Sequence, residues 1–314
     1  MYKIMFSLLV HEEPDVIIDQ MINLNHFVKD SAIVLHINPK FDFEKYNYTF
    51  KEFECEIKKF GNVYINPCRL EVGKDDIIQA HVSNFDFVKG ITFEYFYFIA
   101  SNELFIKNGL YNHICHYEYG CEDLLKKNWH YHEIMKTDPD LQRIIEKNSI
   151  QEYSYSQIEG SFYKKELFEK INKIISENYD YKKKKDKYPR DEIYFSTIAN
   201  GLFKYKNHYN GCCCKIRWEG KILFTSIGSI KRILKNDNLP LYSVKRVDRK
   251  LNNYLRSYIR CHIGHYPLET ARYTKEKIKE SSCVKIYFLN GFYLLKYFFR
   301  NIIAKLYRFI FNKK

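Results

Sequence analysis

Short apolar runs alternate with helical patterns through the first half of the chain, and this alternation constrains the fold more than any other feature. Such alternation predicts an α/β domain around a largely parallel sheet, because each helix returns the chain to the starting edge of the next strand. We expect strands at Tyr2–Val10, Ala32–Ile37, Val63–Ile65 and Phe93–Ala100, and helices at Asp15–Leu24 and Asp75–Val88.

Polar side chains follow three of the expected strands. His11 comes after the first strand, Asn38 after the second, and the turn Ser101-Asn102-Glu103 after the last. In open α/β sheets, ligands bind beyond the carboxyl ends of the strands. These five residues are therefore candidates for a binding site.

The composition limits the class of protein. A chain of 314 residues suffices for one large or two modest domains, and 46% hydrophobic residues allow a substantial core. The net charge of +13 favours anionic partners such as nucleotide phosphates, nucleic acid or an acidic membrane surface. The sequence has no Walker loop and no Rossmann glycine fingerprint, which argues against ATP- and NAD-type sites.

The cysteines and the amino terminus bear on the compartment. None of the nine cysteines forms a Cys-x-x-Cys pair, and the three consecutive cysteines at 212–214 cannot easily bridge one another. The chain enters an expected strand at once, without a charged leader, a cleavage site or a membrane-spanning stretch. We expect a protein of the reducing cytoplasm.

An acidic pair, Asp191-Glu192, follows Pro189 at the start of an amphipathic run. Proline favours a helix start, and acids in the first turn are stabilised by the helix dipole. A carboxylate held there lies on rigid backbone, as a general base requires. Many ordinary helices begin in the same way, so the spacing alone leaves both interpretations open.

Three groups of residues carry side chains that can ligate a metal. The Asp-Pro-Asp at 138–140 follows no apolar strand and is interpreted as a turn. The His-x-His-Glu at 130–133 would diverge on a helix, and His116 is isolated beside Cys115. We predict no metal.

A nucleotide handled without a metal needs fixed cations at its leaving phosphate. The region 215–250 supplies several, although a solvated surface would explain most of them. They are Lys221, Lys231, Arg232, Lys245, Arg246 and Arg249.

The end of the chain differs in composition from the rest. After Glu280 there are seven Lys and Arg and no acidic residue, among many aromatic and aliphatic ones. A helix over about 284–314 would carry basic side chains on one half and apolar side chains on the other, which is typical of helices at anionic membrane surfaces. The longest uncharged run, Ile286–Leu295, is too short to span a bilayer. The alternative is a terminal helix packed on the body of the protein.

Eight motifs stand in order within roughly residues 1–250: Lys3–His11, His36-Ile-Asn-Pro-Lys40, Ser101–Lys107, Gly160-Ser161, Pro189–Ile198, Arg217-Trp218, Gly228–Leu234 and Tyr242–Asp248. This series resembles the core-2/I-branching β-1,6-N-acetylglucosaminyltransferases and xylosyltransferases (glycosyltransferase family 14-like), in their compact bacterial form.

The resemblance implies a donor site for a sugar nucleotide. The position of His11 is that of a family His that lies against the uridine, and Asn38 stands where the family has the Asp that holds the nucleoside. The family's pyrophosphate-binding Lys falls on Arg246, with Lys245 beside it, and a second cation falls near Lys221.

The resemblance also implies the reacting groups. The family's catalytic base falls on Glu192, and Asp191 would help to position it. Glu103 stands where the family has Asp in its Cys-Gly-x-Asp motif. The candidate substrate-binding residues are Ser101, Asn102, Glu103, Gly160, Ser161, Asp191 and Trp218.

Together these features predict a GT-A-type α/β glycosyltransferase domain over residues 1–250 and a helical extension over 251–314. The implied reaction is inverting, metal-independent transfer of a sugar such as N-acetylglucosamine from a UDP-sugar to a hydroxyl of a saccharide or lipid-linked saccharide. The implied setting is bacterial surface polysaccharide biosynthesis (capsule or lipopolysaccharide), at the inner face of the cytoplasmic membrane. We expect no cofactor and no nucleic-acid partner. The alternative is a non-catalytic basic module for nucleic acid or anionic lipid, which does not account for the ordered motifs.

Overall fold

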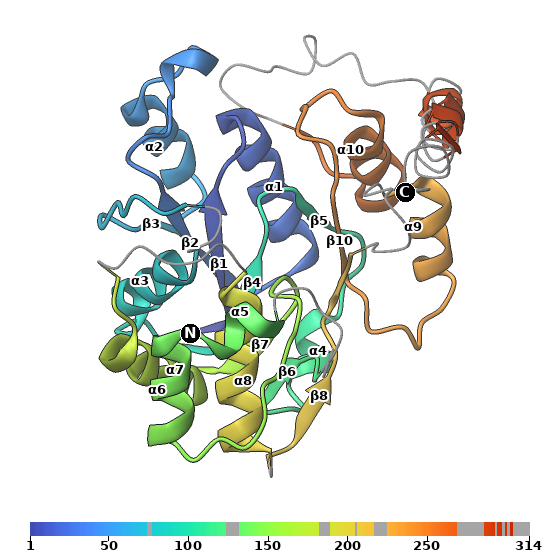
Figure 1. Ribbon diagram of the computed structural model, residues 1–314. Coiled ribbons are helices and arrows are strands. Elements are labelled where there is room, and N and C mark those ends of the chain that lie inside the picture. The colour runs from blue at the N-terminus through green and yellow to red at the C-terminus, as the bar shows by residue number, and fades with distance from the viewer. Residues whose placement is uncertain are drawn as a thin grey trace.

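The computed structural model describes residues 1–73, 77–123, 132–181, 189–204, 206–216, 225–268, 286–292, 294–296, 299 and 302–303. Seven strands form the main sheet (Figure 1), in the order β3 (Val63–Ile65), β2 (Ser31–Ile37), β1 (Tyr2–Val10), β4 (Phe93–Ile99), β7 (Phe162–Lys164), β6 (Tyr119–Cys121) and β8 (His208–Asn210). A smaller sheet contains β5 (Glu103–Phe105), β10 (Ser243–Lys245) and β9 (Cys214–Lys215).

The main sheet is mostly parallel. β1 pairs in parallel with β2 and β4, β2 with β3, and β6 with β8. Among the described strands of this sheet, β7 alone runs against its neighbours. The α/β class and the mostly parallel sheet are therefore confirmed, and the four strands expected from the sequence form within one residue of their expected bounds.

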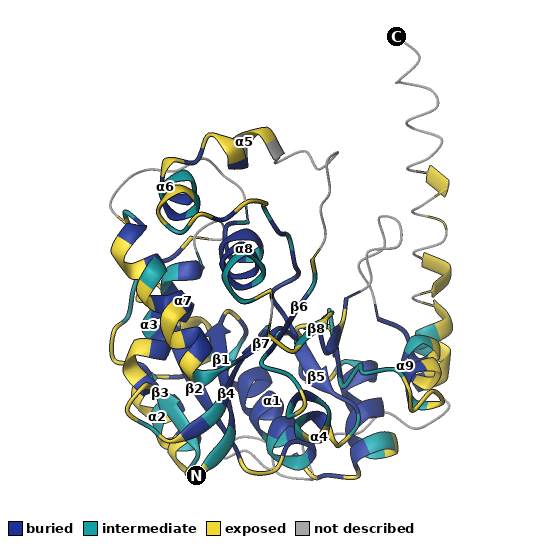
Figure 2. Cartoon of the chain, turned by 90° about the horizontal axis from the view of Figure 1, so that it is seen from below, coloured by how far each residue is buried: buried dark blue, intermediate teal, exposed yellow. Residues whose placement is uncertain are grey.

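Helices cover both faces of the main sheet (Figure 2). Alternate residues of β1 face opposite cores: Phe6 packs with residues of α1 and α2, and Met5 packs with residues of α3, α7 and α8. The helices are α1 (Pro14–Phe27), α2 (Phe50–Lys58), α3 (Ile78–Val88), α4 (Leu110–Ile114), α5 (His132–Lys136), α6 (Pro139–Lys147), α7 (Lys165–Asn178), α8 (Asp191–Phe203), α9 (Ile227–Leu234) and α10 (Tyr254–Tyr258), with the 3-10 helix η1 (Glu44–Tyr46) and the π-helix η2 (Ile259–Gly264).

The chain beyond residue 250 joins the same core. Asp19 of α1 accepts hydrogen bonds from Arg256 of α10 and Arg260 of η2, each 2.8 Å long, and all three side chains are fully buried. The helices that follow residue 250 pack directly on α1. The predicted domain boundary at residue 250 stays a prediction. Among the described residues, no helix is both long and apolar enough to cross a membrane.

One expectation about local structure is wrong, and another is only partly tested. The Asp-Pro-Asp at 138–140 is a helix start and not a turn, because the Asp138 side chain accepts from the backbone N–H groups of Asp140 and Leu141 and caps α6. The helix expected from Asp75 is described from Ile78 onward, and residues 74–76 lie outside the described part of the chain.

Candidate active site

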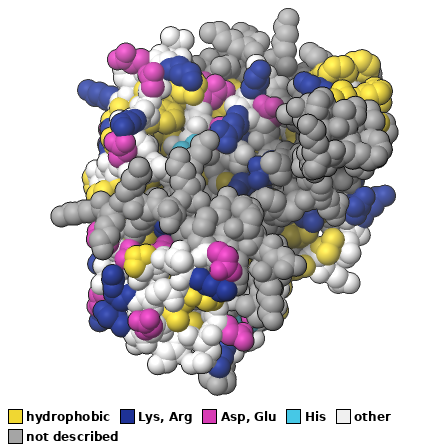
Figure 3. Space-filling model, viewed as in Figure 1, with side chains coloured by type: hydrophobic (Ala, Val, Ile, Leu, Met, Phe, Trp, Pro, Cys, Tyr) yellow, Lys and Arg dark blue, Asp and Glu magenta, His cyan; other side chains and the backbone are white. Residues whose placement is uncertain are grey.

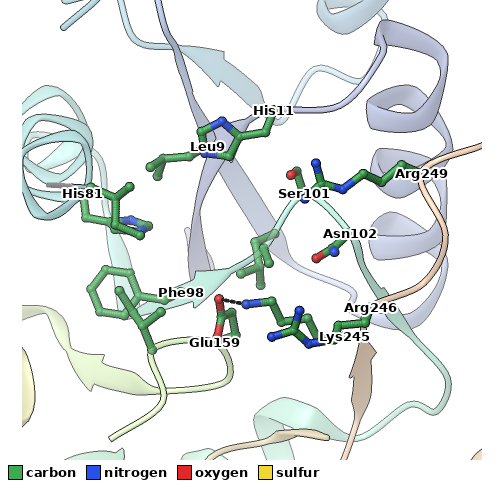
Figure 4. A pocket seen from close by; sticks show the side chains of 14 residues that line it. Leu9, His11, His81, Phe98, Ser101, Asn102, Glu159, Lys245, Arg246 and Arg249 are labelled. Atoms are coloured by element: carbon green, nitrogen blue, oxygen red, sulfur yellow. Dashed lines mark hydrogen bonds and ion pairs between the residues drawn. The ribbon is translucent and has the colours of Figure 1, made fainter. Parts of the chain in front are cut away.

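A cavity of about 190 Å³ lies at the carboxyl ends of β1 and β4 (Figure 4). This is the edge at which the sequence predicted a ligand site. Six of the residues singled out in the sequence line the cavity: His11, Ser101, Asn102, Lys245, Arg246 and Arg249. Their roles stay predictions.

Two consecutive cations, Lys245 and Arg246, both face the cavity although neighbours in a strand point to opposite sides. The backbone explains this, because Arg246 has a left-handed φ of 69° directly after the end of β10. A residue with a Cβ adopts this conformation at a cost of about 1 kcal/mol. The strained turn brings both positive charges to one place.

The Lys245 ammonium forms an ion pair with the Glu159 carboxylate, which also lines the cavity. Both side chains are largely buried, at 17% and 11% exposure. Burial lowers the pKa of Lys245, but the charge of Glu159 and its hydrogen bond outweigh that effect and raise the pKa above its ordinary value. Lys245 therefore stays charged inside the protein.

Gly160 and Ser161 shape the turn that carries Glu159. Gly160 has a φ of 85°, and a Cβ placed on it would lie 2.4 Å from the backbone nitrogen of Cys214. The buried Ser161 hydroxyl donates to the carbonyl of Ile158 at 2.6 Å. Both residues therefore hold the shape of the turn that carries Glu159. Neither is among the residues that line the cavity.

A third cation, Arg249, is held at the cavity by Glu12. The Arg249 Nε lies 3.2 Å from Glu12 Oε1, and the Ser101 hydroxyl donates to the same oxygen at 3.1 Å. Burial raises the pKa of Glu12, and the nearby Arg249 opposes this shift. The Arg249 side chain is 65% exposed, so it is anchored by a buried carboxylate yet open to a ligand.

Glu103 lies beneath the site and not in its wall. Its carboxylate accepts from the Ser243 hydroxyl at 2.5 Å and from the Ala100 backbone N–H at 3.1 Å. Burial raises the pKa of Glu103 to about 7, although both hydrogen bonds oppose the shift. Because Glu103 pairs with Lys245 across β5 and β10, it supports the strand that carries the cations.

The acidic pair begins α8, as the sequence predicted. Asp191 is buried, and burial together with the charges of Glu192 and Glu159 raises its pKa well above the ordinary range. Glu192 is half-buried and forms a hydrogen bond with Tyr155, and neither acid is among the residues that line the cavity. A buried ion pair of 3.0 Å between Arg190 and Asp138 fixes the start of α8 to that of α6.

The remaining predicted residues divide into two groups. Asn38 donates to the carbonyl of Val72 at 3.0 Å and accepts from the backbone N–H of Lys40 at 2.9 Å, so both ends of its amide are used in the local backbone and it is not in the cavity wall. Trp218 and Lys221 lie outside the described residues.

One neutral histidine, His81, lines the cavity, and a second, His36, influences its pKa. The Nδ1 of His81 lies 2.8 Å from the buried Ser7 hydroxyl. Burial and then the nearby His36 lower the pKa of His81 to about 3, and burial and then His11 lower that of His36 to about 4. These two side chains are uncharged at neutral pH, and the cations that line the cavity are Lys245, Arg246 and Arg249.

No metal centre is evident in the described ranges, where no three His, Cys, Asp or Glu side chains gather in a way that could hold an ion. Sequence reasoning did not select Glu159, Glu12 or His81, and it named Arg249 only as one of several cations. The signal for Glu159 was its place directly before Gly160-Ser161, but its partner Lys245 is 86 residues away.

No family model and no curated protein matches the chain. The fold is similar to the galactosyltransferase LgtC in complex with donor and acceptor sugar analogs, at 9% identity over 78% of this chain and 87% of that one, with a TM-score of 0.38. It is also similar to the glycosyltransferase GlyE of Streptococcus pneumoniae TIGR4 (12% identity, 67% and 45% covered, TM-score 0.34) and to S. aureus TarS (13% identity, 54% and 29% covered, TM-score 0.34).

Proposed function

We propose that the protein is a glycosyltransferase of GT-A type that takes a sugar from a nucleoside diphosphate donor, with UDP as the nucleotide. The observation that carries the proposal is the convergence of Lys245, Arg246 and Arg249 in one cavity at the carboxyl ends of parallel strands. A diphosphate leaving group gains negative charge in the transition state, and preorganised cations stabilise that charge. The motif series that resembles the core-2/I-branching family supports the same reaction.

The proposed step is an inverting displacement. The acceptor hydroxyl oxygen bonds to the anomeric carbon as the bond from that carbon to the diphosphate oxygen breaks, on the opposite face of the sugar. Glu192 takes the hydroxyl proton, and UDP leaves with its charge paired to Lys245 and Arg246. A positioned base contributes on the order of a hundredfold or more to the rate.

Glu159 has a part in this proposal that the sequence did not suggest. Its carboxylate holds the Lys245 ammonium in the cavity wall. Before the donor binds, this ion pair keeps Lys245 charged and in position. When the donor binds, its diphosphate would compete with Glu159 for the same ammonium. Glu159 is then a positioning residue for the leaving-group cation.

The finer features are proposals as well. They are metal independence, an N-acetylglucosamine-like sugar, a saccharide or lipid-linked saccharide acceptor, and a role in bacterial surface polysaccharide assembly from the cytoplasm. They depend on the family resemblance. The cation cluster supports metal independence, since it would take the place that a divalent ion has in other transferases.

A panel of sugar nucleotides tests the proposal. We expect one UDP-sugar to be hydrolysed slowly by the purified protein, with UDP released at the same rate with and without EDTA. Abolition by EDTA would refute the metal-free mechanism. A protein that binds sugar nucleotides and turns none over, with any acceptor saccharide tried, would favour the non-catalytic binding module.

A further inference from the structure

The helix near the carboxyl end is fixed to the body of the protein along one side. Ile286 is fully buried in the main core, and Leu289 packs against the same cluster. The Asn290 side-chain oxygen accepts from the first backbone N–H of α9, that of Ile227, at 3.2 Å. The Lys231 ammonium of α9 lies 4.8 Å from the ring centroid of Tyr287. The start of this helix is therefore docked on α9.

The other side of the same helix is apolar and exposed. Phe288, Leu295 and Ile303 are 72%, 60% and 64% exposed, and Phe292 and Phe299 are each more than half exposed. Positions 288, 292, 295, 299 and 303 follow helical spacing, so these five side chains share one face. We call this face the tail stripe. Figure 2 shows the described part of this helix exposed beside α9, and Figure 3 shows hydrophobic side chains gathered where Figure 1 places it.

Charge identifies what the tail stripe meets. The chain has seven Lys and Arg and no acidic residue after Glu280, and Lys296 is exposed on the described part of the helix. A second copy of the chain would bring the same positive charges against these. An anionic lipid surface pairs with them and also takes up aromatic and aliphatic side chains.

We propose that the tail stripe inserts into the headgroup region of an anionic bilayer while α9 holds the helix to the body. Contiguous exposed apolar surface on a soluble protein marks an interaction site. The docked side, with Ile286 and Asn290, fixes the orientation of the body toward the lipid. This inference does not depend on the proposed transfer reaction.

Vesicle sedimentation with the full-length chain tests the proposal. We expect binding to vesicles with about 30% phosphatidylglycerol and on the order of tenfold weaker binding to pure phosphatidylcholine. The double variant Leu295→Gln/Ile303→Gln should lower partitioning to the anionic vesicles by on the order of tenfold, because it removes apolar surface without changing charge. The matched control is Phe87→Gln, which alters an apolar side chain of α3 that is 41% exposed and should bind as the wild type does.

Three outcomes would overturn the proposal. They are equal pelleting of the double variant and the wild type, no binding of the wild type to anionic vesicles, and a wild-type dimer in light scattering that the double variant abolishes. Circular dichroism and thermal unfolding should show the double variant folded, since both substituted side chains are exposed. Donor hydrolysis in the absence of lipid should be unchanged in the double variant, which separates a failure here from a failure of the proposed reaction.

Discussion

Glu103 is a carboxyl group whose burial should be visible in the pH dependence of stability. Its pKa is about 7 in the folded protein against an ordinary value of 4.5, so the folded state binds the proton more tightly. Proton binding at Glu103 therefore stabilises the folded state by about 3 kcal/mol. This stabilisation is fully present below pH 4.5 and is lost as pH rises through 7.

We predict that Glu103→Gln removes this dependence. As pH rises from 4.5 to 8, the free energy of unfolding of the wild type should fall by roughly 3 kcal/mol more than that of the variant. The reason is that a neutral amide has no ionisation cost. Urea denaturation at both pH values measures the difference. Parallel changes in the two proteins would contradict the assignment, and the comparison cancels the other titrating groups.

Glu192→Gln should reduce donor turnover by about a hundredfold or more and leave the KM for the donor nearly unchanged, since the amide keeps the shape but cannot accept the proton. The matched control is Glu166→Gln, which alters an exposed first-turn acid of another helix, α7. Initial rates of UDP release measure both variants. Turnover at the wild-type level in Glu192→Gln would remove Glu192 from the role of base.

The position of a side chain could be predicted from the sequence where it follows directly from the element that carries it, while its role stays a prediction. His11 and Ser101 reach the cavity because strand ends in a parallel sheet meet at one edge. Glu159 was not predicted because its proposed role depends on its ion pair with Lys245. The two residues are far apart in the sequence and are brought into contact only by the fold. Asn38 was expected at the nucleoside, and its amide is engaged by the backbone of its own turn and a neighbouring loop.

At the scale of elements, the turn before β7 is built around a close approach of two backbones. Gly160 donates to the carbonyl of Phe98 at 3.0 Å and accepts from the N–H of Cys213 at 2.9 Å. A methyl group there meets backbone atoms, which cannot move aside as a flexible side chain can.

We therefore expect Gly160→Ala to lower the free energy of unfolding by about 3 kcal/mol or more, through left-handed strain and overpacking together. Gly61→Ala is the control, since Gly61 has a similar φ of 70° with nothing within 4 Å of an added Cβ. That variant should lose only about 1 kcal/mol. Equal losses in the two variants, measured by chemical denaturation, would show that strain alone decides the cost.

Most of the predicted elements are long, and the three-residue β3 is the one short strand among the described ones that the sequence predicted. The four amino-terminal strands and the start of α8 lie where the sequence placed them. The strands of the smaller sheet have three residues or fewer, too few to show a period, and the antiparallel direction of β7 depends on partners distant in sequence. Asp138 was interpreted as part of a turn because capping residues and turn residues are the same types.

At the scale of the whole molecule, the buried contact of Asp19 with Arg256 and Arg260 joins the amino-terminal helix to the helices after residue 250. Removing one partner of a buried pair leaves uncompensated charge and typically costs 3–5 kcal/mol, roughly, in stability. Asp19→Asn should show a loss of that size and a single unfolding transition.

The control for this variant is Glu177→Gln, which alters a surface pair with Lys173 that is 3.8 Å long and should cost less than about 0.5 kcal/mol. Differential scanning calorimetry measures both. Two separate transitions in the wild type would mean that the residues after 250 unfold as an independent domain, in line with the boundary that the sequence predicted.

Titration calorimetry with UDP and uridine tests whether the cavity binds a nucleoside diphosphate through Lys245, Arg246 and Arg249. We predict that UDP binds at least about tenfold more tightly than uridine, and that Lys245→Met removes most of this difference while leaving uridine binding in place. Equal affinity of the wild type for UDP and uridine, or an undiminished preference for UDP in Lys245→Met, would contradict the account.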